Sequence, residues 1–346
     1  MSTGARGAAW PDPWARSVSI LLLSVDEAPM LAHSLPAALA QEPAAEVVVV
    51  DNACRDQTAE LATGHGAVHL RLRHRVSYAA AVNQAVAATG GDAVLLLNAD
   101  CFLEPGCLAA MLARLAEPGV GSVAPKLLRA RAPDGTQRTG PPGSAGVALG
   151  QIDAAGMFLD RRRKNGLVGH GRAASAFSTA AEAFGADGAA ALYRRETLED
   201  CALGGYELLD EDMELWASDA DLAWRARLLG WRCRYEPAAL ARHVRTYSPS
   251  TRAQMSEQAR RLQFRNRLLM MAKNETRAGL ARDAPIIAAY EVLALGHALL
   301  RERHLLRGYA EAWRLLPGAR RRRALIQGRR RVARPPFGLV PEERGP

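Results

Sequence analysis

The sequence is short of the residues that mark several common classes of protein. Aromatic side chains make up only 5% of its 346 residues, and lysine occurs only as Lys126, Lys164 and Lys273. No nucleic-acid-binding motif is present, so the pI near 9.7 does not predict a nucleic-acid partner. An apolar content of 49% with 23% charged residues is typical of a globular chain.

Cysteine is also scarce. The five cysteines are odd in number, lie far apart in the sequence and form no C-x-x-C pair: Cys54, Cys101, Cys107, Cys201 and Cys233. This pattern argues against a disulfide framework and against a zinc site, and it fits a reducing compartment.

The two commonest phosphate-binding loops are missing. No G-x-G-x-x-G follows the first predicted strand, and the chain contains no G-x-x-x-x-G-K-[ST]. The sequence therefore lacks the loops of ordinary dinucleotide-binding proteins and of P-loop proteins. A nucleotide diphosphate would then need another source of positive charge, such as a metal ion.

Neither a secretory leader nor a membrane span is predicted. Residues 1–16 contain no apolar core of signal-peptide length, and we expect an irregular N-terminal tail there. The apolar stretch Ala284–Leu300 is about 17 residues long and contains Glu291 and His297. That is short and polar for a span of about 20 residues, so we expect a cytoplasmic protein.

Positive charge gathers at the C-terminal end. Residues 301–346 carry thirteen Arg and four Glu, a net charge of +9 that equals the charge of the whole chain. The clusters Arg320–Arg323 and Arg329–Arg331 follow a helical pattern that contains Trp313. Arginine and tryptophan on an amphipathic helix are typical of binding to anionic lipid. We therefore expect a peripheral protein whose basic C-terminus binds the inner face of the cell membrane.

Strand and helix patterns alternate along the first hundred residues. Strands are predicted at Val18–Leu23, Glu46–Val50, Val68–Leu72 and Val94–Leu97, and helices at Met30–Ala40, Asp56–Ala62 and Tyr78–Ala88. This alternation predicts an α/β fold with a mostly parallel sheet. Further along, the pattern predicts an edge strand at Arg232–Tyr235 and helices at Met255–Lys273 and Ile286–Leu316.

The stretch Val94–Asp100 organises the rest of the chain. Four apolar residues run directly into Asn98 and Asp100, and ligands bind at the carboxyl ends of such strands. A hard divalent cation on Asp100 would carry a diphosphate on its far side. The alternative for Asp100 is a simple cap of the next helix.

Several motifs occur in a fixed order between Ser17 and Lys273. They are Val47–Ala53 with Asp51, Tyr78–Asn83, Leu97–Asp100, Asp187–Ala190 with Arg194 and Arg195, Asp210–Asp212, and Ser218–Leu222 with Arg225, Gly230 and Trp231. Together they resemble an inverting family 2 glycosyltransferase with the GT-A fold, in particular its rhamnosyltransferase-like branch. This chain departs from the family pattern at Ser218, where the family usually has Glu.

The resemblance implies a role for each site residue. Asp219 would be the general base, and Asp100 and His243 would be the ligands of Mg²⁺ or Mn²⁺. The donor would be contacted by Ser24, Asp26, Asp51, Asn83 and Asn98. The acceptor would be contacted by Asp187, Gly188, Asp221 and Arg225. Crowded carboxylates raise each other's pKa, which suits a base near neutral pH. Asp221 lies two residues after Asp219 and is expected to orient Arg225 at i+4 rather than to react.

These features predict a glycosyltransferase in four parts. Residues 17–245 would form the GT-A domain, with a nucleotide-sugar half (17–128) and an acceptor half (129–245), followed by a helical extension (246–318) and an Arg-rich tail (319–346). The expected donor is a dTDP-, UDP- or GDP-sugar, and the expected acceptor is a glycan or a lipid-linked precursor. The alternatives are a catalytically impaired nucleotide-sugar-binding relative, suggested by Ser218 and Asn98, and a nucleotidyltransferase.

Overall fold

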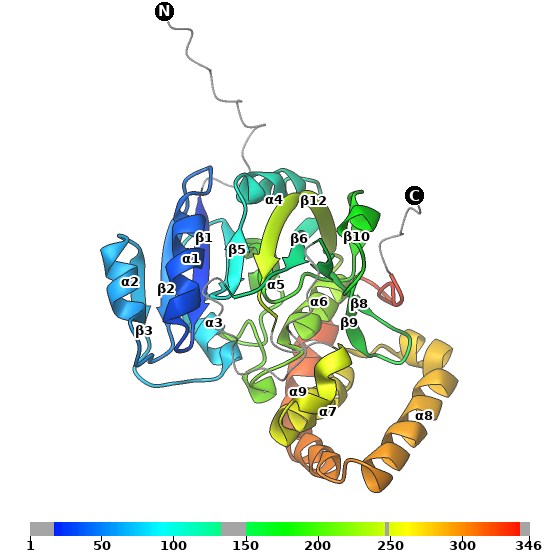
Figure 1. Ribbon diagram of the computed structural model, residues 1–346. Helices are drawn as coiled ribbons and strands as arrows, with labels where there is room; N and C mark the ends of the chain where they lie inside the picture. Colours follow the sequence, from blue (N-terminus) through cyan, green and yellow to red (C-terminus); the bar gives the residue numbers. More distant parts are fainter. Residues whose placement is uncertain (1–16, 133–149, 246–248, 340–346) are drawn as a thin grey trace, which may run out of the picture.

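A ten-stranded sheet forms the centre of the computed structural model, which describes residues 17–132, 150–245 and 249–339 (Figure 1). Its strands are β1 (Val18–Ser24), β2 (Glu46–Asp51), β3 (Val68–Arg71), β4 (Ala93–Asn98), β5 (Cys101–Leu103), β6 (Val120–Arg129), β7 (Ile152–Ala154), β10 (Ala181–Ala183), β11 (Ala190–Arg194) and β12 (Arg232–His243). Strands β8 (Met157–Leu159) and β9 (Asn165–Leu167) form a separate pair. The predicted tail at residues 1–16 and the last residues, 340–346, lie outside the described residues.

Helices cover both faces of this sheet and extend beyond it. They are α1 (Ala28–Leu39), α2 (Thr58–Gly64), α3 (Tyr78–Ala87), α4 (Cys107–Leu115), α5 (Arg195–Asp200), α6 (Ser218–Leu228), α7 (Glu257–Asn274), α8 (Arg277–Leu300) and α9 (Leu305–Arg329). Every strand and helix predicted between Val18 and Leu97 is confirmed, with bounds that differ by a few residues.

The strand order explains how distant segments meet at one edge. The order is β10-β12-β6-β11-β4-β1-β2-β3. Strands β3, β2, β1 and β4 run parallel, β6 and β12 run in the same direction, and β11 lies between β4 and β6 in the opposite direction. The start of β11, where Ala190 pairs with Leu97, therefore lies beside the carboxyl ends of the parallel strands. The expected mostly parallel α/β sheet is confirmed.

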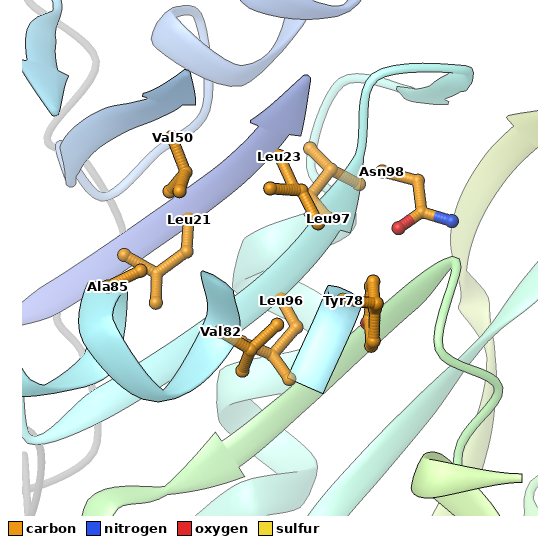
Figure 2. Close-up of a pocket in the computed structure, with 9 residues that line it drawn as sticks. All are labelled: Leu21, Leu23, Val50, Tyr78, Val82, Ala85, Leu96, Leu97 and Asn98. Carbon is orange, nitrogen blue, oxygen red and sulfur yellow. The ribbon is translucent and has the colours of Figure 1, made fainter. Parts of the chain in front are cut away.

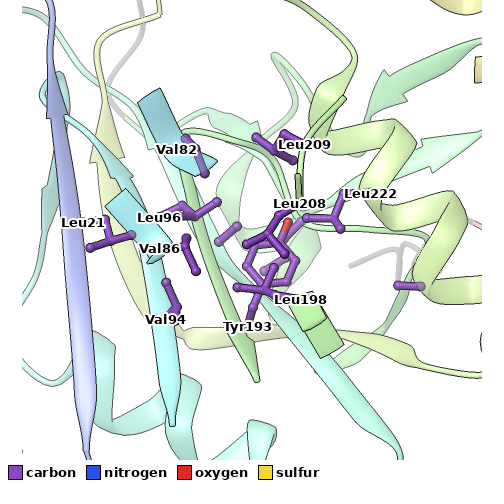
Figure 3. Close-up of a cluster of buried hydrophobic side chains, with 14 of the residues drawn as sticks. Leu21, Val82, Val86, Val94, Leu96, Tyr193, Leu198, Leu208, Leu209 and Leu222 are labelled. Atoms are coloured by element: carbon purple, nitrogen blue, oxygen red, sulfur yellow. The ribbon is translucent and has the colours of Figure 1, made fainter. Parts of the chain in front are cut away.

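Alternation along the central strands fills two separate cores. Leu21 and Leu96 face α3, α5 and α6, whereas Ile20 and Leu95 face α1 and α4. Figure 3 shows the first of these cores, with Val82 and Val86 of α3 against the strands and Leu222 of α6 on the far side. Side chains on both faces of the same strands are buried, so these strands are continuous apolar runs. The polar residues at their carboxyl ends lie together at one edge of the sheet.

The edge-strand prediction for Arg232–Tyr235 is wrong. Strand β12 runs on to His243 and lies between β10 and β6, so it is an interior strand. A shift in its pairing with β6 between Glu236 and Leu240 interrupts the regular alternation, which hides the second half of the strand from sequence patterns. This continuation carries His243 to the edge that Asp100 occupies.

The C-terminal helices form a bundle below the sheet (Figure 1). Helices α7 and α9 pack along each other, while α8 stands apart at the side. The predicted boundary between extension and tail, at residues 318 and 319, falls inside α9. The cluster Arg320–Arg323 is therefore part of a helix that packs on the rest of the protein.

Candidate functional site

Asp100 and His243 meet at the carboxyl edge of the sheet. Asp100 follows β4, His243 ends β12, and the Nε2 atom of His243 lies 3.3 Å from Oδ1 of Asp100. The other ring nitrogen, Nδ1, lies 2.8 Å from Oδ2 of Asp153. Burial alone would lower the pKa of His243, but the two carboxylates outweigh it and raise that pKa to about 9.

Asp153 and Arg245 belong to the site and were missed from the sequence. The Nε atom of Arg245 lies 2.8 and 2.9 Å from the two carboxylate oxygens of Asp153, and Nη2 donates to Oδ2 of Asp187 across 2.9 Å. Burial would raise the pKa of Asp153, yet Arg245 and His243 hold it below its usual value. The available signal was a carboxylate inside the apolar run Ile152–Ala155, where a charge must find a partner.

Asp219 lies in the first turn of α6 and faces the segment before β11. Its Oδ2 accepts a hydrogen bond from the backbone N–H of Gly188 at 3.1 Å, and its Oδ1 accepts from the N–H of Ala220 at 2.8 Å. The Tyr78 hydroxyl donates to the carbonyl of Gly188 at 3.4 Å. Burial, and then the negative charge of Asp187, raise the pKa of Asp219 to about 6. A carboxylate with that pKa is suited to accept a proton near neutral pH.

The loop before α6 is strained and tightly held. Glu214, Trp216 and Ala217 adopt left-handed backbone angles, with φ of 58°, 73° and 60°. Each such residue costs roughly 1–3 kcal/mol and persists only where its surroundings impose it. The buried amide of Asn266 donates to the carbonyls of Met213, Leu215 and Trp216 at 2.6, 2.8 and 3.0 Å. These three hydrogen bonds fix the loop that leads into α6 and therefore the position of Asp219.

Asp221 and Arg225 form the predicted i,i+4 pair, and they do so inside the protein. Both side chains are fully buried, and Arg225 Nε lies 2.9 Å from Asp221 Oδ2. Asp221 also contacts Lys273 at 3.1 Å and Asn274 at 2.7 Å. An acceptor contact with either residue would require these internal contacts to open.

On the donor side, the predicted residues line the ends of β1 and β2. Asp51 is fully buried and accepts from the backbone N–H of Cys54, from His69 and from Arg71 at 2.7, 2.9 and 2.8 Å. The buried hydroxyl of Ser24 lies 3.0 Å from that of Thr58. A nucleobase N–H would therefore have to share the Asp51 carboxylate with protein donors.

Asp26 and Asn83 are engaged in other ways. Asp26 is exposed and pairs with Arg75 at 2.6 Å. The amide of Asn83 is buried and makes four hydrogen bonds to the segment 208–211, which leads into the acidic segment before α6. Direct donor binding by Asn83 would break this bracing.

Asn98 lies at one end of a small apolar hollow between the sheet and α3. Figure 2 shows Asn98 and Tyr78 at one end of the row of lining side chains, with the apolar residues of β1, β2, β4 and α3 behind them. The hollow measures about 10 Å³, close to the minimum for one water molecule. It is too small for a nucleotide, so a donor has to lie outside it, over the edge of the sheet.

Two groups of side chains offer donors to a cation, and they differ in fit. Asp26, Cys54 and Asp56 place ligand atoms within 4.8 Å of one another, but Asp26 and Asp56 already accept hydrogen bonds from backbone N–H groups. Asp100 and His243 offer a carboxylate oxygen and an imidazole nitrogen. Asp153 holds the far nitrogen of His243, as carboxylates do behind metal-binding histidines. In the second pair the Asp100 carboxylate is the ligand type that Mg²⁺ and Mn²⁺ share, and the imidazole of His243 would add a nitrogen ligand once it is deprotonated.

The fold and the edge that carries these residues define a GT-A-type domain. The model of the family "Glycosyl transferase family 2" matches residues 19–201, more than half of the chain. The chain belongs to this family. The family part of the predicted resemblance is therefore confirmed.

Solved structures share this fold, and one relative is similar in part of its sequence. A mannosyltransferase from Pyrobaculum calidifontis, solved with GDP-Man and Mn²⁺, is 19% identical with a TM-score of 0.50, and the match covers 92% of this chain and 88% of that one. TarS 1–349 of S. aureus is 14% identical with a TM-score of 0.53, covering 90% and 88%. The succinoglycan biosynthesis protein ExoU of Rhizobium meliloti is 33% identical over 28% of this chain and 30% of its own length. The matches to curated relatives span only 20% and 30% of those proteins.

Proposed function

We propose that this protein transfers a sugar from a nucleotide diphosphate to a glycan or lipid-linked acceptor, by single displacement with inversion. The observation that carries the proposal is Asp219, a carboxylate with a pKa near 6 that faces Gly188 at the edge where Asp100 and His243 lie. Glycosyl transfer requires a base for the acceptor hydroxyl and a group that neutralises the leaving diphosphate. Asp219 could supply the first, and a cation held by Asp100 and His243 the second.

In the proposed reaction the acceptor hydroxyl gives its proton to Asp219 as its oxygen attacks the anomeric carbon of the donor. The bond from that carbon to the diphosphate breaks on the opposite face, and the configuration inverts. Asp100 and His243 would hold Mg²⁺ or Mn²⁺, which supplies Lewis-acid neutralisation of the leaving diphosphate. Asp187 and Gly188 would place the acceptor beside the base. Asp221 and Arg225 would act from the interior, by fixing α6.

Relatives support the donor class. The mannosyltransferase was solved with GDP-Man and Mn²⁺, and TarS was solved with UDP-GlcNAc. A dTDP-, UDP- or GDP-linked hexose or rhamnose fits the proposal, with Ser24, Asp26, Asp51 and Asn98 along the donor side. The likeness to a succinoglycan biosynthesis protein supports a role in making a cell-envelope polysaccharide.

The location that we propose is the cytoplasm, at the inner face of the membrane. The basic clusters of α9 contribute less to this than their charge implies, because several of them contact the protein. Arg322 lies 2.7 Å from Glu207 and also pairs with Asp212, while Arg323 donates to the carbonyl of Ala272. Arg322 therefore braces the acidic segment before α6, and Arg323 contacts α7. Arg320, Arg321 and Arg330 stay exposed and can contact lipid.

A screen of nucleotide sugars tests the donor and the metal together. We expect the right donor to raise the melting temperature with Mn²⁺ or Mg²⁺ and not with EDTA, because a ligand at 100 times its Kd adds about 2.7 kcal/mol of stability. Asp100→Ala should keep its own melting temperature and lose the metal-dependent rise. Asp26→Ala tests the other acidic group. Because Asp26 also lies on the donor side, only the difference between the rise with Mn²⁺ and the rise in EDTA is compared for this variant. Equal stabilisation in EDTA, or a metal-dependent rise that is lost in Asp26→Ala and kept in Asp100→Ala, would rule out the metal assignment.

A further inference from the structure

Helix α8 exposes apolar side chains where a soluble helix would expose polar ones. The exposed fractions are 71% for Val292, 72% for Leu293, 48% for Leu299 and 81% for Leu300. Between Asp283 and Arg301 the sequence contains one charged residue, Glu291. Surface helices of globular proteins normally turn their apolar side inward, and large exposed apolar faces mark interaction sites.

The inward side of α8 carries two acidic residues beside the buried Ile287 and Ala298, and their ion pairs hold the helix in this orientation. Asp283 is fully buried and lies 2.7 Å from Arg161 and 2.9 Å from the buried Arg163. Glu291 lies 2.5 Å from Arg267. Both acidic residues of α8 therefore face arginines of the catalytic domain and of α7. Turning the apolar side inward would break these ion pairs. Two of them involve the Asp283 carboxylate, which is completely buried.

Positive charge follows immediately after the apolar face. Arg301, Arg303 and Arg307 are exposed at the turn into α9. The acidic residue among them, Glu302, is taken up by Arg252 and Arg260, each at 3.0 Å. The turn therefore presents net positive charge next to exposed leucines. This combination complements a surface with an apolar interior and anionic headgroups.

We propose that the outer face of α8 and the α8–α9 turn bind an anionic lipid bilayer, with Leu293, Leu299 and Leu300 in the acyl boundary. Val292 instead lines a hollow that α8 shares with α7 and α9. The proposal rests on the membrane part of the proposed function and adds an apolar contact to the basic one. Among the described residues, α8 is also long and apolar enough to cross a membrane, and little of it is buried in the protein. The pairs at Asp283 and Glu291 tie it to the domain, so it lies in the plane of the membrane interface.

Co-sedimentation of the full chain with vesicles tests the surface. We expect binding to phosphatidylcholine vesicles that contain phosphatidylglycerol, weaker binding to pure phosphatidylcholine, and further weakening with salt. Leu293→Glu should weaken binding by about tenfold or more, because a charge replaces an inserted side chain. Arg301→Gln combined with Arg303→Gln and Arg307→Gln should remove the preference for anionic vesicles and leave the weaker binding.

Val68→Glu is the matched control, since Val68 is 51% exposed on the edge strand β3 and receives the same charge. It should bind vesicles as the parent does. The proposal is overturned if the parent does not bind, if Leu293→Glu binds like Val68→Glu, or if the parent is a dimer that Leu293→Glu dissociates without change in vesicle binding. Donor-dependent stabilisation of the same variants is measured separately, so failure of the transfer proposal is distinguishable from failure of this one.

Discussion

Arg245 donates to Asp187 across 2.9 Å while its Nε contacts both oxygens of Asp153. One guanidinium therefore joins the carboxylate behind His243 to the carboxylate beside Asp219. Positive charge at this point lowers the pKa of Asp219, and the neighbouring Asp187 raises it. Asp153 behind His243 and Asp187 beside Asp219 are thus coupled electrostatically through Arg245.

Replacement of Arg245 should change the pH dependence of the reaction. Arg245→Gln removes the charge that lowers the pKa of Asp219 and leaves Asp187 unpaired, and both effects raise that pKa. The acidic limb of the kcat/KM profile should move to higher pH, and stability should fall by about 3–5 kcal/mol, the cost of breaking a buried pair. Arg242→Gln is the control, because Arg242 is 44% exposed in its pair with Glu104 and should cost under about 1 kcal/mol. If the acidic limb does not move, the charge of Arg245 does not control the pKa of Asp219.

Removal of the base should lower the rate and leave donor binding intact. Asp219→Asn cannot accept a proton, so turnover should fall by roughly 10²–10⁴-fold. In the parent, activity should rise as the pH increases through about 6, since the ionised carboxylate is the working form. Initial rates and donor affinity measured across pH check both statements. Parent-like turnover in Asp219→Asn would place the base elsewhere.

Asp219 should also make the free energy of unfolding depend on pH. Its pKa is raised from 3.8 to about 6 on folding, so its contribution to stability is full below pH 3.8 and is lost as the pH rises through about 6. The stability of Asp219→Asn relative to the parent should therefore increase by about 1–3 kcal/mol between roughly pH 4 and 8. Urea unfolding of both proteins across pH measures this change. A difference that does not vary with pH would mean that Asp219 titrates normally.

A methyl group at Gly188 should obstruct the acceptor without disturbing the fold. A Cβ there would lie 3.5 Å from Oδ2 of Asp219 and 3.5 Å from the Tyr78 hydroxyl, which is ordinary contact. Gly188→Ala should therefore keep its melting temperature and raise the KM for the acceptor several-fold. Gly90→Ala, with nothing within 4 Å, is the control. A large loss of stability in Gly188→Ala would indicate a structural role only.

Asp221 should behave differently from Asp219 two residues earlier. Asp221→Asn leaves the buried Arg225 without its counter-charge and leaves Lys273 with Asp210 alone, which should cost about 3–5 kcal/mol. Activity measured on the folded fraction should fall far less than in Asp219→Asn. Asp26→Asn, at an exposed carboxylate, should change stability little. If Asp221→Asn is stable and inactive, Asp221 touches substrate.

The sequence predicts the edge of the sheet better than it predicts the contacts made there. Asp51, Asn98 and Asp100 were found because apolar strands end at them, and this signal is local. Arg245 and Asp153 are 92 residues apart and meet through the pairing of β7 and β12 with β6, which no local pattern encodes.

The acidic residues before and within α6 show the same limit from another side. Asp219 and Asp221 look alike in the sequence, and burial raises the pKa of both, but their charged partners give them opposite net pKa shifts. Asp219 faces the negative charge of Asp187, whereas Asp221 faces Lys273 and Arg225. The partners of Asp221 on α7 lie more than fifty residues away, so spacing alone could not separate the two roles.

The reversed strand β11 also shapes how the chain must fold. Its neighbours β4 and β6 are complete by Arg129, but the strand between them begins at Ala190. At a synthesis rate of about 5–20 residues per second, that slot stays open for about 3–12 s on the ribosome. One edge of β4 and both edges of β6 are unpaired during this interval, since β12 also comes later in the chain, and such edges recruit other chains. Yield in a heterologous host should therefore depend on translation speed between residues 130 and 190, far from any residue of the site.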